Sequence, residues 1–498
     1  MIRVYSALAA FGFAVLAFAA VWLGGLNQDE GWYLYAAQLV ADGQIPYRDF
    51  FYTQAPLMPL VYSVFAGVWE TWGLVGARVL TLAFGSIGIV FAAALARSLV
   101  PEGRRGLASL LVILMLGGNL YHLYYVTIPK TYALASVCAT AGFCVLLSER
   151  RRGLSAFASG ILLAMAAGTR ISLGVLLAVA GVWLLVGGER LRWLWFALGG
   201  ALALALIYGP PLAFERSRAG LAAAQAYHAA RGGFDVVFTV GSLSRLVRWY
   251  LPVFVMLGIG VWAKAFRAPG PGLLLAGFGA VFFVQMLAPF PYEDYQVPVM
   301  GLLTAAAAAM AVRGAETPRT VSLLPLLALG MTWAGSFGSP LLQEWMIDGQ
   351  DRFWPIKKQK CEMAQLREVA REIEALDPGG KTLLTQDLYL AVETGRRVPR
   401  QLAMGPFSYW GESLPYPGAE ETALDDEGMR ALLDGAPCEI AAMSGYSFAI
   451  TVPRCNETPF EKQMEFWSML KKRYELVFRE CGFGQNSTTL LVLKRRQE

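Results

Sequence analysis

The chain has little charge and few residues of the kinds that bind metals or nucleotides. Only 16% of its 498 residues are charged, and its two histidines, His122 and His228, stand in no HExxH motif, so a zinc protease is not supported. It also has no P-loop, no dinucleotide fingerprint and no CxxC pair, which leaves no visible machinery for nucleotide hydrolysis or hydride transfer. The net charge of +5 is small and dispersed, and this argues against a nucleic-acid partner.

Hydrophobic residues, by contrast, make up 56% of the chain, and the mean hydropathy is +0.46. These values are typical of a polytopic membrane protein rather than of a soluble domain. The first apolar run has no small-residue cleavage site before the acidic stretch, so we expect it to remain as a signal anchor. About eleven runs are long enough to cross ~30 Å of hydrocarbon, and they cover residues 5–25, 78–98, 107–126, 131–148, 154–169, 171–187, 193–213, 249–267, 271–290, 296–312 and 320–338.

Basic residues predict how these spans are oriented, because positively charged connections stay on the cytoplasmic side. Alternate connections carry Arg97, Arg104, Arg105, Arg150, Arg151, Arg152, Arg190, Arg192, Lys264, Arg267, Arg313 and Arg319. A cytoplasmic N-terminus places all of them inside, and it places the first loop, 26–77, and the tail, 339–498, outside. The Ala-, Gly- and Arg-rich composition suggests a bacterium, so we expect a multi-pass inner-membrane protein with a periplasmic tail.

The tail after residue 338 mixes helix and strand patterns. Residues 361–381 and 460–475 have apolar side chains at helical spacing, and the first of these segments ends in the helix stop Pro378-Gly379-Gly380. Short strands are predicted for KTLLTQ (381–386), EIAAMS (439–444) and STTLLVLKR (487–495). The sequence therefore predicts residues 1–338 as a membrane domain and 339–498 as a small soluble α/β domain.

Four of the six cysteines lie in this tail: Cys361, Cys438, Cys455 and Cys481. An oxidising compartment permits one or two disulfides among them, and four cysteines allow three pairings. Free buried thiols are the alternative, and the sequence leaves the pairing open.

The first outer loop opens with an adjacent acidic pair, Asp29 and Glu30, directly after a span. A carboxylate held at this boundary can accept a proton from an acceptor hydroxyl, and it can also hold a hard divalent cation. Simple solvation of a surface loop is the alternative. The aromatic residues Trp32, Tyr33 and Tyr35 around the pair, together with cations on other outer loops, favour a reaction centre.

Other ionisable residues also lie on the outer side. Arg48 and Asp49 are adjacent in the first loop and are interpreted as a pair that fixes it, while Glu293 and Asp294 lie in the short connection PFPYEDYQVP. We group them with Tyr33 as candidate loop or acceptor-side residues.

Basic residues outside the membrane break the positive-inside pattern, most clearly in the loop 214–248. One explanation is an error in the topology, a second is a loop that binds lipid headgroups, and a third is a site for an anion such as phosphate, which suits the planar fork of arginine. The candidate phosphate ligands are Lys130, Arg170, Arg231 and Arg245. For Arg170, which lies between two short apolar runs, a structural partner is as good an interpretation as a phosphate.

Several segments, in this order, resemble the GT-C-fold glycosyltransferases of membranes, a superfamily that includes protein O-mannosyltransferases, aminoarabinose transferases and RgtA-like enzymes. The segment DEGWYLYAAQLVADGQIPYRDFFYTQAPLMPLVYSVF is similar to their first outer loop, and GTRISLGVLLAVAGVWLL to their Gly-Thr-Arg segment. EDYQVPVMGLLTAAAA resembles a His-Tyr-x-x-Pro segment with Asp294 in place of the histidine, and LTQDLYLAVETGRRVPRQLAMGPFSYW resembles the outer domain of bacterial members.

This resemblance implies a GT-C-like membrane domain that uses a polyprenyl-phosphate-linked sugar on the outer face. Asp29 matches the acidic residue after the first span, so it is implied as the general base, with Glu30 as its helper. The aminoarabinose-transferase branch has Glu-Lys-Pro for metal and phosphate binding, whereas this chain has Gln54-Ala55-Pro56. We therefore assign no metal: zinc is doubtful, and a divalent cation is left open.

The predicted function is an inverting glycosyltransferase that moves a hexose or pentose to an acceptor hydroxyl, with membrane lipids around it and an unidentified glycan, lipid or protein as acceptor. A transporter or flippase of an envelope substrate is one alternative, but such proteins place ionisable residues near the bilayer midplane and show repeated halves. A non-catalytic envelope assembly protein is the other alternative.

Overall fold

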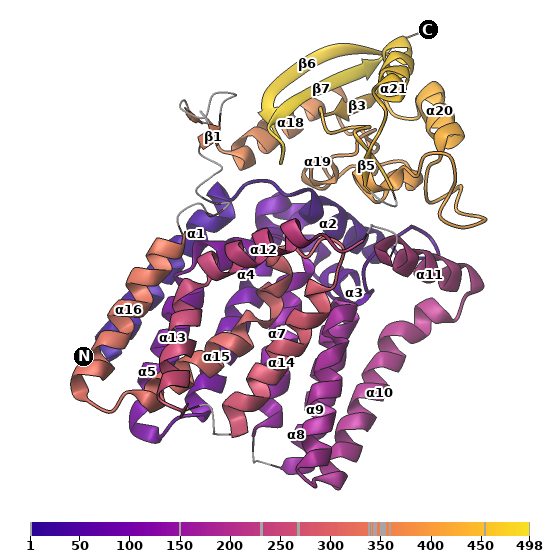
Figure 1. The fold of residues 1–498 in the computed structure, drawn as a ribbon. Helices are drawn as coiled ribbons and strands as arrows, with labels where there is room; N and C mark the ends of the chain where they lie inside the picture. The colour runs from indigo at the N-terminus through magenta and orange to yellow at the C-terminus, as the bar shows by residue number, and fades with distance from the viewer. Residues whose placement is uncertain are drawn as a thin grey trace. The chain divides into compact units, whose positions relative to one another are not determined.

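The computed structural model describes residues 2–148, 151–229, 233–265, 269–336, 360–452 and 455–497, together with short pieces between 339 and 357 (Figure 1). The chain forms two compact units. The helical unit comprises Met1–Gly24, Val79–Ile207 and Gly233–Lys357, and the mixed unit comprises Gly25–Arg78, Tyr208–Gly232 and Lys358–Glu498. This grouping differs from the domain boundary that the sequence suggests at residue 338, because the first outer loop folds together with the tail.

Every apolar run predicted as a span contains a helix. The helices of these runs are α1 (Ile2–Leu23), α4 (Ala66–Ser98), α5 (Arg105–Val112), α6 (Leu120–Tyr125), α7 (Thr131–Leu146), α8 (Arg152–Thr169), α9 (Val175–Val186), α10 (Arg190–Leu212), α13 (Leu251–Trp262), α14 (Pro269–Met286), α15 (Val297–Gly314) and α16 (Pro318–Ser336). One further helix of the helical unit, α12 (Val236–Trp249), precedes α13 at an angle of 81°.

By length and composition, four of the described helices are able to cross a membrane: α4, α8, α10 and the continuous segment Glu293–Gly314 that contains α15. The number rises to six if each of two broken helix pairs is counted as one span. The shorter apolar helices, among them α7, do not reach the same length. The total of eleven spans therefore stays a prediction.

Helix α15 forms the centre of the helical unit. It lies among α5, α7, α13 and α14 (Figure 1), and its residues from Val297 to Val312 are buried on every side. Small side chains make this possible, since alanine and glycine let helix axes approach closely. A Cβ added at Gly301, for example, would lie only 2.6 Å from Thr140 Cγ2 on α7.

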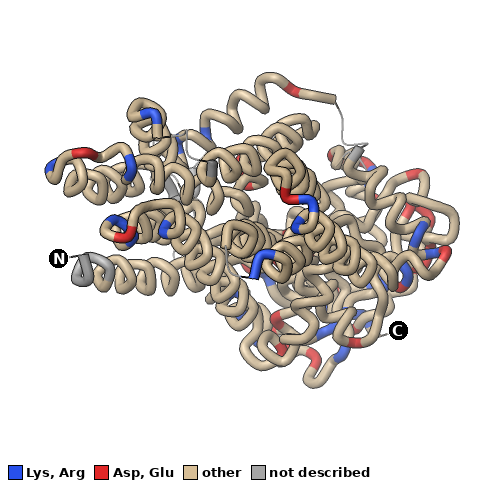
Figure 2. Tube along the Cα trace, turned by 90° about the horizontal axis from the view of Figure 1, so that it is seen from below, with Lys and Arg blue, Asp and Glu red and all other residues tan. Residues whose placement is uncertain are grey.

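Basic residues from three of the predicted connections lie at one end of the helical unit. Helices α7 and α15 begin side by side, because Lys130 before α7 forms an ion pair with Asp294 before α15, so their last turns share the opposite end. At that end Arg192 donates to Leu146 O (2.7 Å), Arg104 donates to Val312 O (2.6 Å), and Arg313 donates to Leu99 O (2.6 Å). Figure 2 shows long stretches of helix without charged residues, and the Lys, Arg, Asp and Glu residues lie mainly near the helix ends. This arrangement fits the alternation of basic connections in the sequence.

The mixed unit contains short helices and a small antiparallel sheet. Its sheet has the strand order β3-β7-β6. The elements are α2 (Gln28–Ala41), α3 (Leu57–Ser63), α11 (Glu215–Ala229), α18 (Glu362–Leu376), α19 (Leu388–Thr394), α20 (Asp426–Gly435), β3 (Ile440–Met443), β4 (Ile450–Thr451), β5 (Asn456–Glu457), α21 (Phe460–Arg473), β6 (Tyr474–Phe483) and β7 (Thr488–Arg495). Two short strands outside this unit, β1 (Met346–Asp348) and β2 (Pro355–Lys357), pair with each other.

Most of the elements predicted in the tail are confirmed. Helices α18 and α21 and strands β3 and β7 match their predicted segments. The strand predicted for KTLLTQ is wrong, since Thr382 and Leu384 form only isolated bridges, to Arg397 and Ala441. Strand β6 was not predicted, because half of its residues are exposed and charged residues interrupt its apolar pattern.

Of the two alternatives that the sequence leaves open for the tail cysteines, disulfides or free thiols, the structure has free thiols. Cys361, Cys438, Cys455 and Cys481 are all free thiols. They belong to four different places in the unit: the start of α18, the residue pair before β3, the β4–β5 turn and strand β6. Cys438 is buried, and burial raises the pKa of its thiol, so it behaves as a core residue.

Helix α2 packs against α19 at a glycine. A Cβ added at Gly31 would lie 2.9 Å from the Leu388 carbonyl carbon and closer still to Tyr389 N. These are backbone atoms, which cannot rotate away, so only glycine allows this approach.

Gly31→Ala is therefore expected to lower the free energy of unfolding by about 1–3 kcal/mol, the usual cost of overpacking. Denaturant unfolding of the detergent-solubilised protein would measure the loss. Gly67→Ala in the first turn of α4, where an added Cβ meets nothing within 4 Å, is the matched control and should change stability by less than about 0.5 kcal/mol. Equal losses in the two variants would contradict the close packing of α2 on α19.

Candidate active site

Asp29 lies in the first turn of α2, in a position fixed by a capping box. Asn27 Oδ1 accepts a hydrogen bond from Asp29 N–H (3.0 Å), and Glu30 Oε1 accepts one from Asn27 N–H (2.9 Å). The half-buried Asp29 side chain accepts a hydrogen bond from Trp32 Nε1 at 3.0 Å. Unpaired backbone N–H groups make the start of a helix favourable for negative charge. The carboxylate is therefore ordered, partly accessible and held in an environment that suits its ionised form.

Glu30, in contrast, is completely buried and paired with Arg78. The Glu30 and Arg78 side chains each have 0% exposure, and Arg78 donates from Nε and Nη2 to both carboxylate oxygens at 2.9 and 2.7 Å. Arg78 Nη2 also donates to Gly25 O (2.8 Å). These contacts favour a positioning role for Glu30 rather than direct contact with a substrate.

Arg78 is a residue that the sequence analysis missed. It is the first residue of the apolar run 78–98, where it was treated as part of a span. A charged residue at the edge of such a run needs a partner, and this rule could have identified it as important. It could not have identified Glu30 as the partner, since 48 residues separate the two.

Tyr33, on α2, belongs to an aromatic cluster with Trp32 and Tyr52. Its ring stacks on Trp32 with a centroid distance of 3.7 Å and meets Tyr52 edge-on at 6.4 Å. Tyr33 and Tyr52 are both buried. The structure therefore places Tyr33 in the core that supports α2, not on an open surface.

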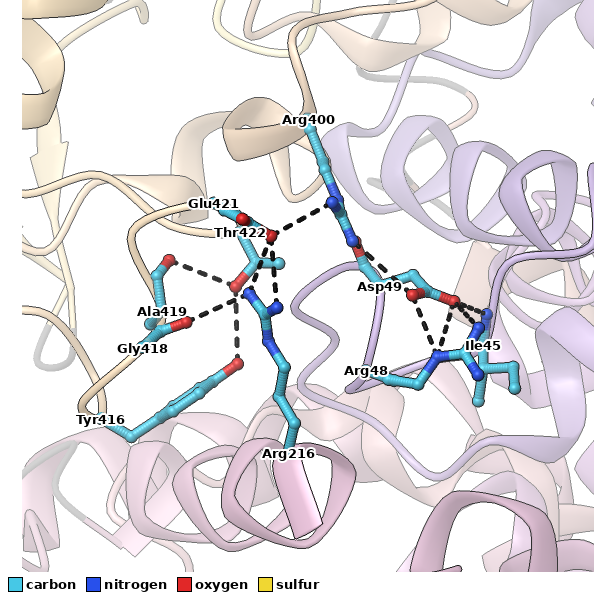
Figure 3. Close-up of polar contacts among 10 residues, drawn as sticks. All are labelled: Ile45, Arg48, Asp49, Arg216, Arg400, Tyr416, Gly418, Ala419, Glu421 and Thr422. Atoms are coloured by element: carbon cyan, nitrogen blue, oxygen red, sulfur yellow. Dashed lines mark hydrogen bonds and ion pairs between the residues drawn. The ribbon is translucent and has the colours of Figure 1, made fainter. Parts of the chain in front are cut away.

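Arg48 and Asp49 belong to a chain of alternating charges within the mixed unit (Figure 3). Arg48 Nη2 lies 2.7 Å from Asp49 Oδ2, and Arg400 Nη2 lies 3.6 Å from Asp49 Oδ1. Glu421 pairs in turn with Arg400 (3.3 Å) and Arg216 (3.2 Å). Burial alone would raise the pKa of Asp49, but hydrogen bonds from Arg48 and Ile45 N–H and the charge of Arg400 lower it below its ordinary value. Half-exposed ion pairs of this kind can hold the first loop against the tail.

A second cluster lies within the helical unit, where α7, α9 and α15 begin. Lys130 Nζ is 3.0 Å from Asp294 Oδ2, which also accepts a hydrogen bond from Tyr132 OH (2.8 Å). Arg170 Nη1 donates to Thr131 Oγ1 (3.2 Å). With two cations and one anion, these three charged side chains carry a net charge of +1.

The Lys130 cluster, which consists of Lys130, Arg170 and Asp294, also contacts aromatic rings. The Arg170 guanidinium lies 4.9 Å from the ring centre of Tyr132 and 5.0 Å from that of Tyr295, and Lys130 Nζ lies 4.7 Å from the Tyr132 ring. Cation–π contacts of this kind hold a cation in place without neutralising it. Lys130 and Asp294 are each only 7% exposed, so the charges act in a partly desolvated environment.

The remaining predicted residues pair with each other or lie outside the described residues. Arg245 Nε, on α12, pairs with Glu293 Oε1 at 2.9 Å, and Ser242 Oγ donates to Glu293 Oε2 at 3.3 Å. Arg231 lies outside the described residues. The structure thus brings Lys130, Arg170 and Asp294 together in the helical unit, while Glu30, the neighbour of Asp29 in the sequence, pairs with Arg78 in the mixed unit.

Gln54, which stands where the resemblance has the glutamate of Glu-Lys-Pro, contacts a histidine. Its Nε2 lies 3.2 Å from His228 Nε2, which is also 2.7 Å from Thr53 O. With its proton on Nε2, the imidazole donates to that carbonyl. Within the described parts of the chain, no group of three His, Cys, Asp or Glu side chains is placed to hold a metal ion.

No protein-family model and no curated protein sequence matches the chain. Among solved structures, it is similar to ArnT from Cupriavidus metallidurans bound to undecaprenyl phosphate, with a TM-score of 0.64 and 14% identity over 98% of this chain and 97% of that one. It is also similar to the apo oligosaccharyltransferase from Archaeoglobus fulgidus, with a TM-score of 0.52 and 11% identity over 98% of this chain and 74% of that one. Both neighbours are GT-C glycosyltransferases, and the chain has their fold.

Proposed function

We propose that this GT-C-fold chain is an inverting glycosyltransferase that takes a sugar from a polyprenyl-phosphate donor. The observation that carries the proposal is the likeness, over nearly the whole length, to a structure that holds undecaprenyl phosphate. The ordered, half-buried Asp29 carboxylate at the start of α2 supplies the matching chemistry.

In the proposed reaction, the oxygen of an acceptor hydroxyl attacks the anomeric carbon of the sugar. The bond from that carbon to the phosphate oxygen breaks, and its electron pair stays with the lipid phosphate. The hydroxyl proton passes to Asp29, which acts as the general base. Attack from the face opposite the leaving group inverts the configuration at the anomeric carbon.

The leaving phosphate needs positive charge that is already in place, because preorganised charge stabilises the transition state without rearrangement. The Lys130 cluster offers this, with a net charge of +1 and an Arg170 guanidinium held between two tyrosine rings. The N-terminus of α7, for which Lys130 is the capping residue, adds backbone N–H groups that favour an anion. We assign donor-phosphate binding to Lys130 and Arg170, with Arg245 in a supporting role.

The proposed topology follows the sequence pattern. Eleven spans with a cytoplasmic N-terminus would place the basic connections inside and the tail in the periplasm. Membrane lipids would surround the helical unit, whose helices carry many exposed apolar side chains, such as Leu206, Val186 and Trp262.

The test uses the purified, detergent-solubilised protein and a panel of undecaprenyl-phosphate hexoses and pentoses. We expect one of them to lose its sugar, releasing undecaprenyl phosphate, while sugar nucleotides are left intact. Consumption of a sugar nucleotide with no loss from any lipid donor would overturn the proposal. Movement of an intact lipid-linked sugar across vesicles, without its cleavage, would support a flippase instead.

Arg170→Gln should raise the KM for the donor about tenfold or more, because a hydrogen bond to a charged group contributes ~1.5–3 kcal/mol. Steady-state kinetics with the donor identified in the panel would measure this. Arg319→Gln, which removes an exposed cation at the start of α16, is the matched control and should leave the KM unchanged. An unchanged KM in Arg170→Gln would remove Arg170 from the donor site.

A further inference from the structure

The residues just before Asp29 are held by three side chains from the tail. Leu26 N–H donates to Glu362 Oε2, and Gln28 N–H donates to Gln485 Oε1 at 2.8 Å. The Gln28 side chain donates from Nε2 to Asp387 Oδ1 at 3.0 Å. The tail therefore holds the chain on the N-terminal side of the proposed general base.

Asp387 is a buried carboxyl group with only neutral hydrogen-bond donors around it. It is 1% exposed, and its Oδ1 also accepts hydrogen bonds from Tyr389 OH (2.9 Å) and Ser444 Oγ (3.3 Å). The charged residue Glu30, a further carboxylate, is close enough to raise the pKa of Tyr389. Burial raises the pKa of Asp387 itself, although the hydrogen bonds from Gln28, Tyr389 and Ser444 oppose this.

Two oxygen atoms at this contact have no hydrogen-bond partner among the described residues: Asp387 Oδ2 and Gln28 Oε1. Both are buried, and a buried polar atom without a partner costs about 1–3 kcal/mol. An ionised carboxylate can only accept hydrogen bonds, as can an amide oxygen, so the two atoms cannot satisfy each other in that state. A proton on Oδ2 would turn it into a donor, and the Gln28 amide oxygen would be its acceptor.

We propose that Asp387 is protonated and forms a two-point acid–amide pair with Gln28, which makes Asp387 a positioning residue for Asp29. Gln28 Nε2 donates to Asp387 Oδ1, and Asp387 Oδ2–H donates to Gln28 Oε1. The connection to Asp29 rests on the proposed function, whereas the pair itself does not.

Such a pair fixes position in a way that a single hydrogen bond does not. Two parallel hydrogen bonds define the orientation of the Gln28 amide, and Gln28 and Asp29 are adjacent in the first turn of α2. Small displacements of a catalytic group reduce the rate strongly. The pair also links α2 to the start of α19, next to the Gly31 contact.

The experiment first replaces the Asp387 carboxyl group and the Gln28 amide one at a time. Asp387→Asn keeps the acceptor Oδ1 and replaces the O–H donor by N–H, so unfolding temperature and transfer rate should stay close to those of the parent. Asp387→Leu removes both hydrogen bonds, and Gln28→Glu places two carboxyl groups together. Each should lower the unfolding temperature by about 5 °C, and transfer should fall about tenfold.

The decisive variant combines Gln28→Glu with Asp387→Asn, which restores an acid–amide pair with the roles reversed. It should recover both stability and transfer relative to Gln28→Glu, and this recovery is a coupling that a double-mutant cycle measures. The infrared difference spectrum between the parent and Asp387→Asn should contain the carbonyl band of a protonated carboxyl group. Asp434→Asn, at an exposed ion pair with Arg473, is the control and should change neither stability nor transfer.

Two outcomes would overturn the proposal. One is an Asp387→Asn variant that is stable but as inactive as Asp387→Leu, which would mean that the ionised carboxylate is needed. The other is the absence of the protonated band together with no recovery in the double variant. Neither unfolding nor infrared measurements require a donor, so a failure of the proposed function would be seen separately, as a parent protein without transfer but with an intact pair.

Discussion

Asp29→Asn is expected to reduce sugar transfer about 10²–10⁴-fold, the contribution of a well-placed general base. The amide has no basic oxygen that could take the acceptor proton, yet it keeps an oxygen to accept the hydrogen bond from Trp32 Nε1. The fold should therefore be retained while the chemical step fails. The measurement is the release of undecaprenyl phosphate at saturating donor, compared with the thermal unfolding of the same preparation.

The matched control for this substitution is Asp42→Asn, at the other end of α2. Asp42 forms a half-exposed ion pair with Arg397, and exposed pairs of this kind contribute only about 0–1 kcal/mol. Transfer should be unchanged in this variant. Full activity in Asp29→Asn would exclude Asp29 as the base. Loss of folding in that variant would contradict the expectation that the fold is retained, and it would point to a structural role of the start of α2, where Glu30 pairs with Arg78.

Arg78→Met is expected to lower the free energy of unfolding by about 3–5 kcal/mol, because it leaves a buried carboxylate without its partner. Glu30 and Arg78 both have fully buried side chains, so no solvent can replace the lost ion pair. The same loss should follow from Glu30→Ala. Denaturant unfolding in detergent and the yield of folded protein would measure both.

Replacing both charges at once should restore most of that stability. Glu30→Gln keeps an acceptor for the N-cap hydrogen bond from Asn27, and combined with Arg78→Met it removes both buried charges. As a control, Glu421→Gln at the half-exposed pair with Arg216 should cost less than about 1 kcal/mol. If Arg78→Met cost no more than this control, the pair would not hold α2 in place.

The helices of the fold were largely predictable from the sequence, because each span is a local apolar run. The position of α15 at the centre was less predictable, since its alanine-rich sequence suits close packing but does not identify the helices that pack against it. Strand β6 was not predicted because half of its residues are exposed and only its two ends are buried, so the pattern that normally identifies a strand is weak there. Elements that depend on a local sequence pattern could be predicted, and features that depend on tertiary contacts could not.

The candidate site shows the same limit. Asp29 was identifiable because it directly follows an apolar run, and Lys130 and Asp294 were identifiable as charges beside such runs. Their partners were not, since Lys130 and Asp294 are 164 residues apart and Gln28 and Asp387 are 359 apart. A single sequence carries no information that links such distant positions. In the folded chain, the hydrogen bonds between these buried side chains show which residues are partners.

The mixed unit is built from segments that are far apart in the sequence, and this affects the order in which it can assemble during synthesis. Its first segment, Gly25–Arg78, emerges from the ribosome long before the tail that completes it. At roughly 5–20 residues per second, the 359 positions between Gln28 and Asp387 correspond to roughly 20–70 s of synthesis. During that interval, α2 has neither the backbone of α19 against Gly31 nor the tail residues that hold Gln28. Assembly of the site therefore waits for the end of translation, and a chain released early would carry every helix of the helical unit and still lack the tail contacts that hold Gln28 beside Asp29.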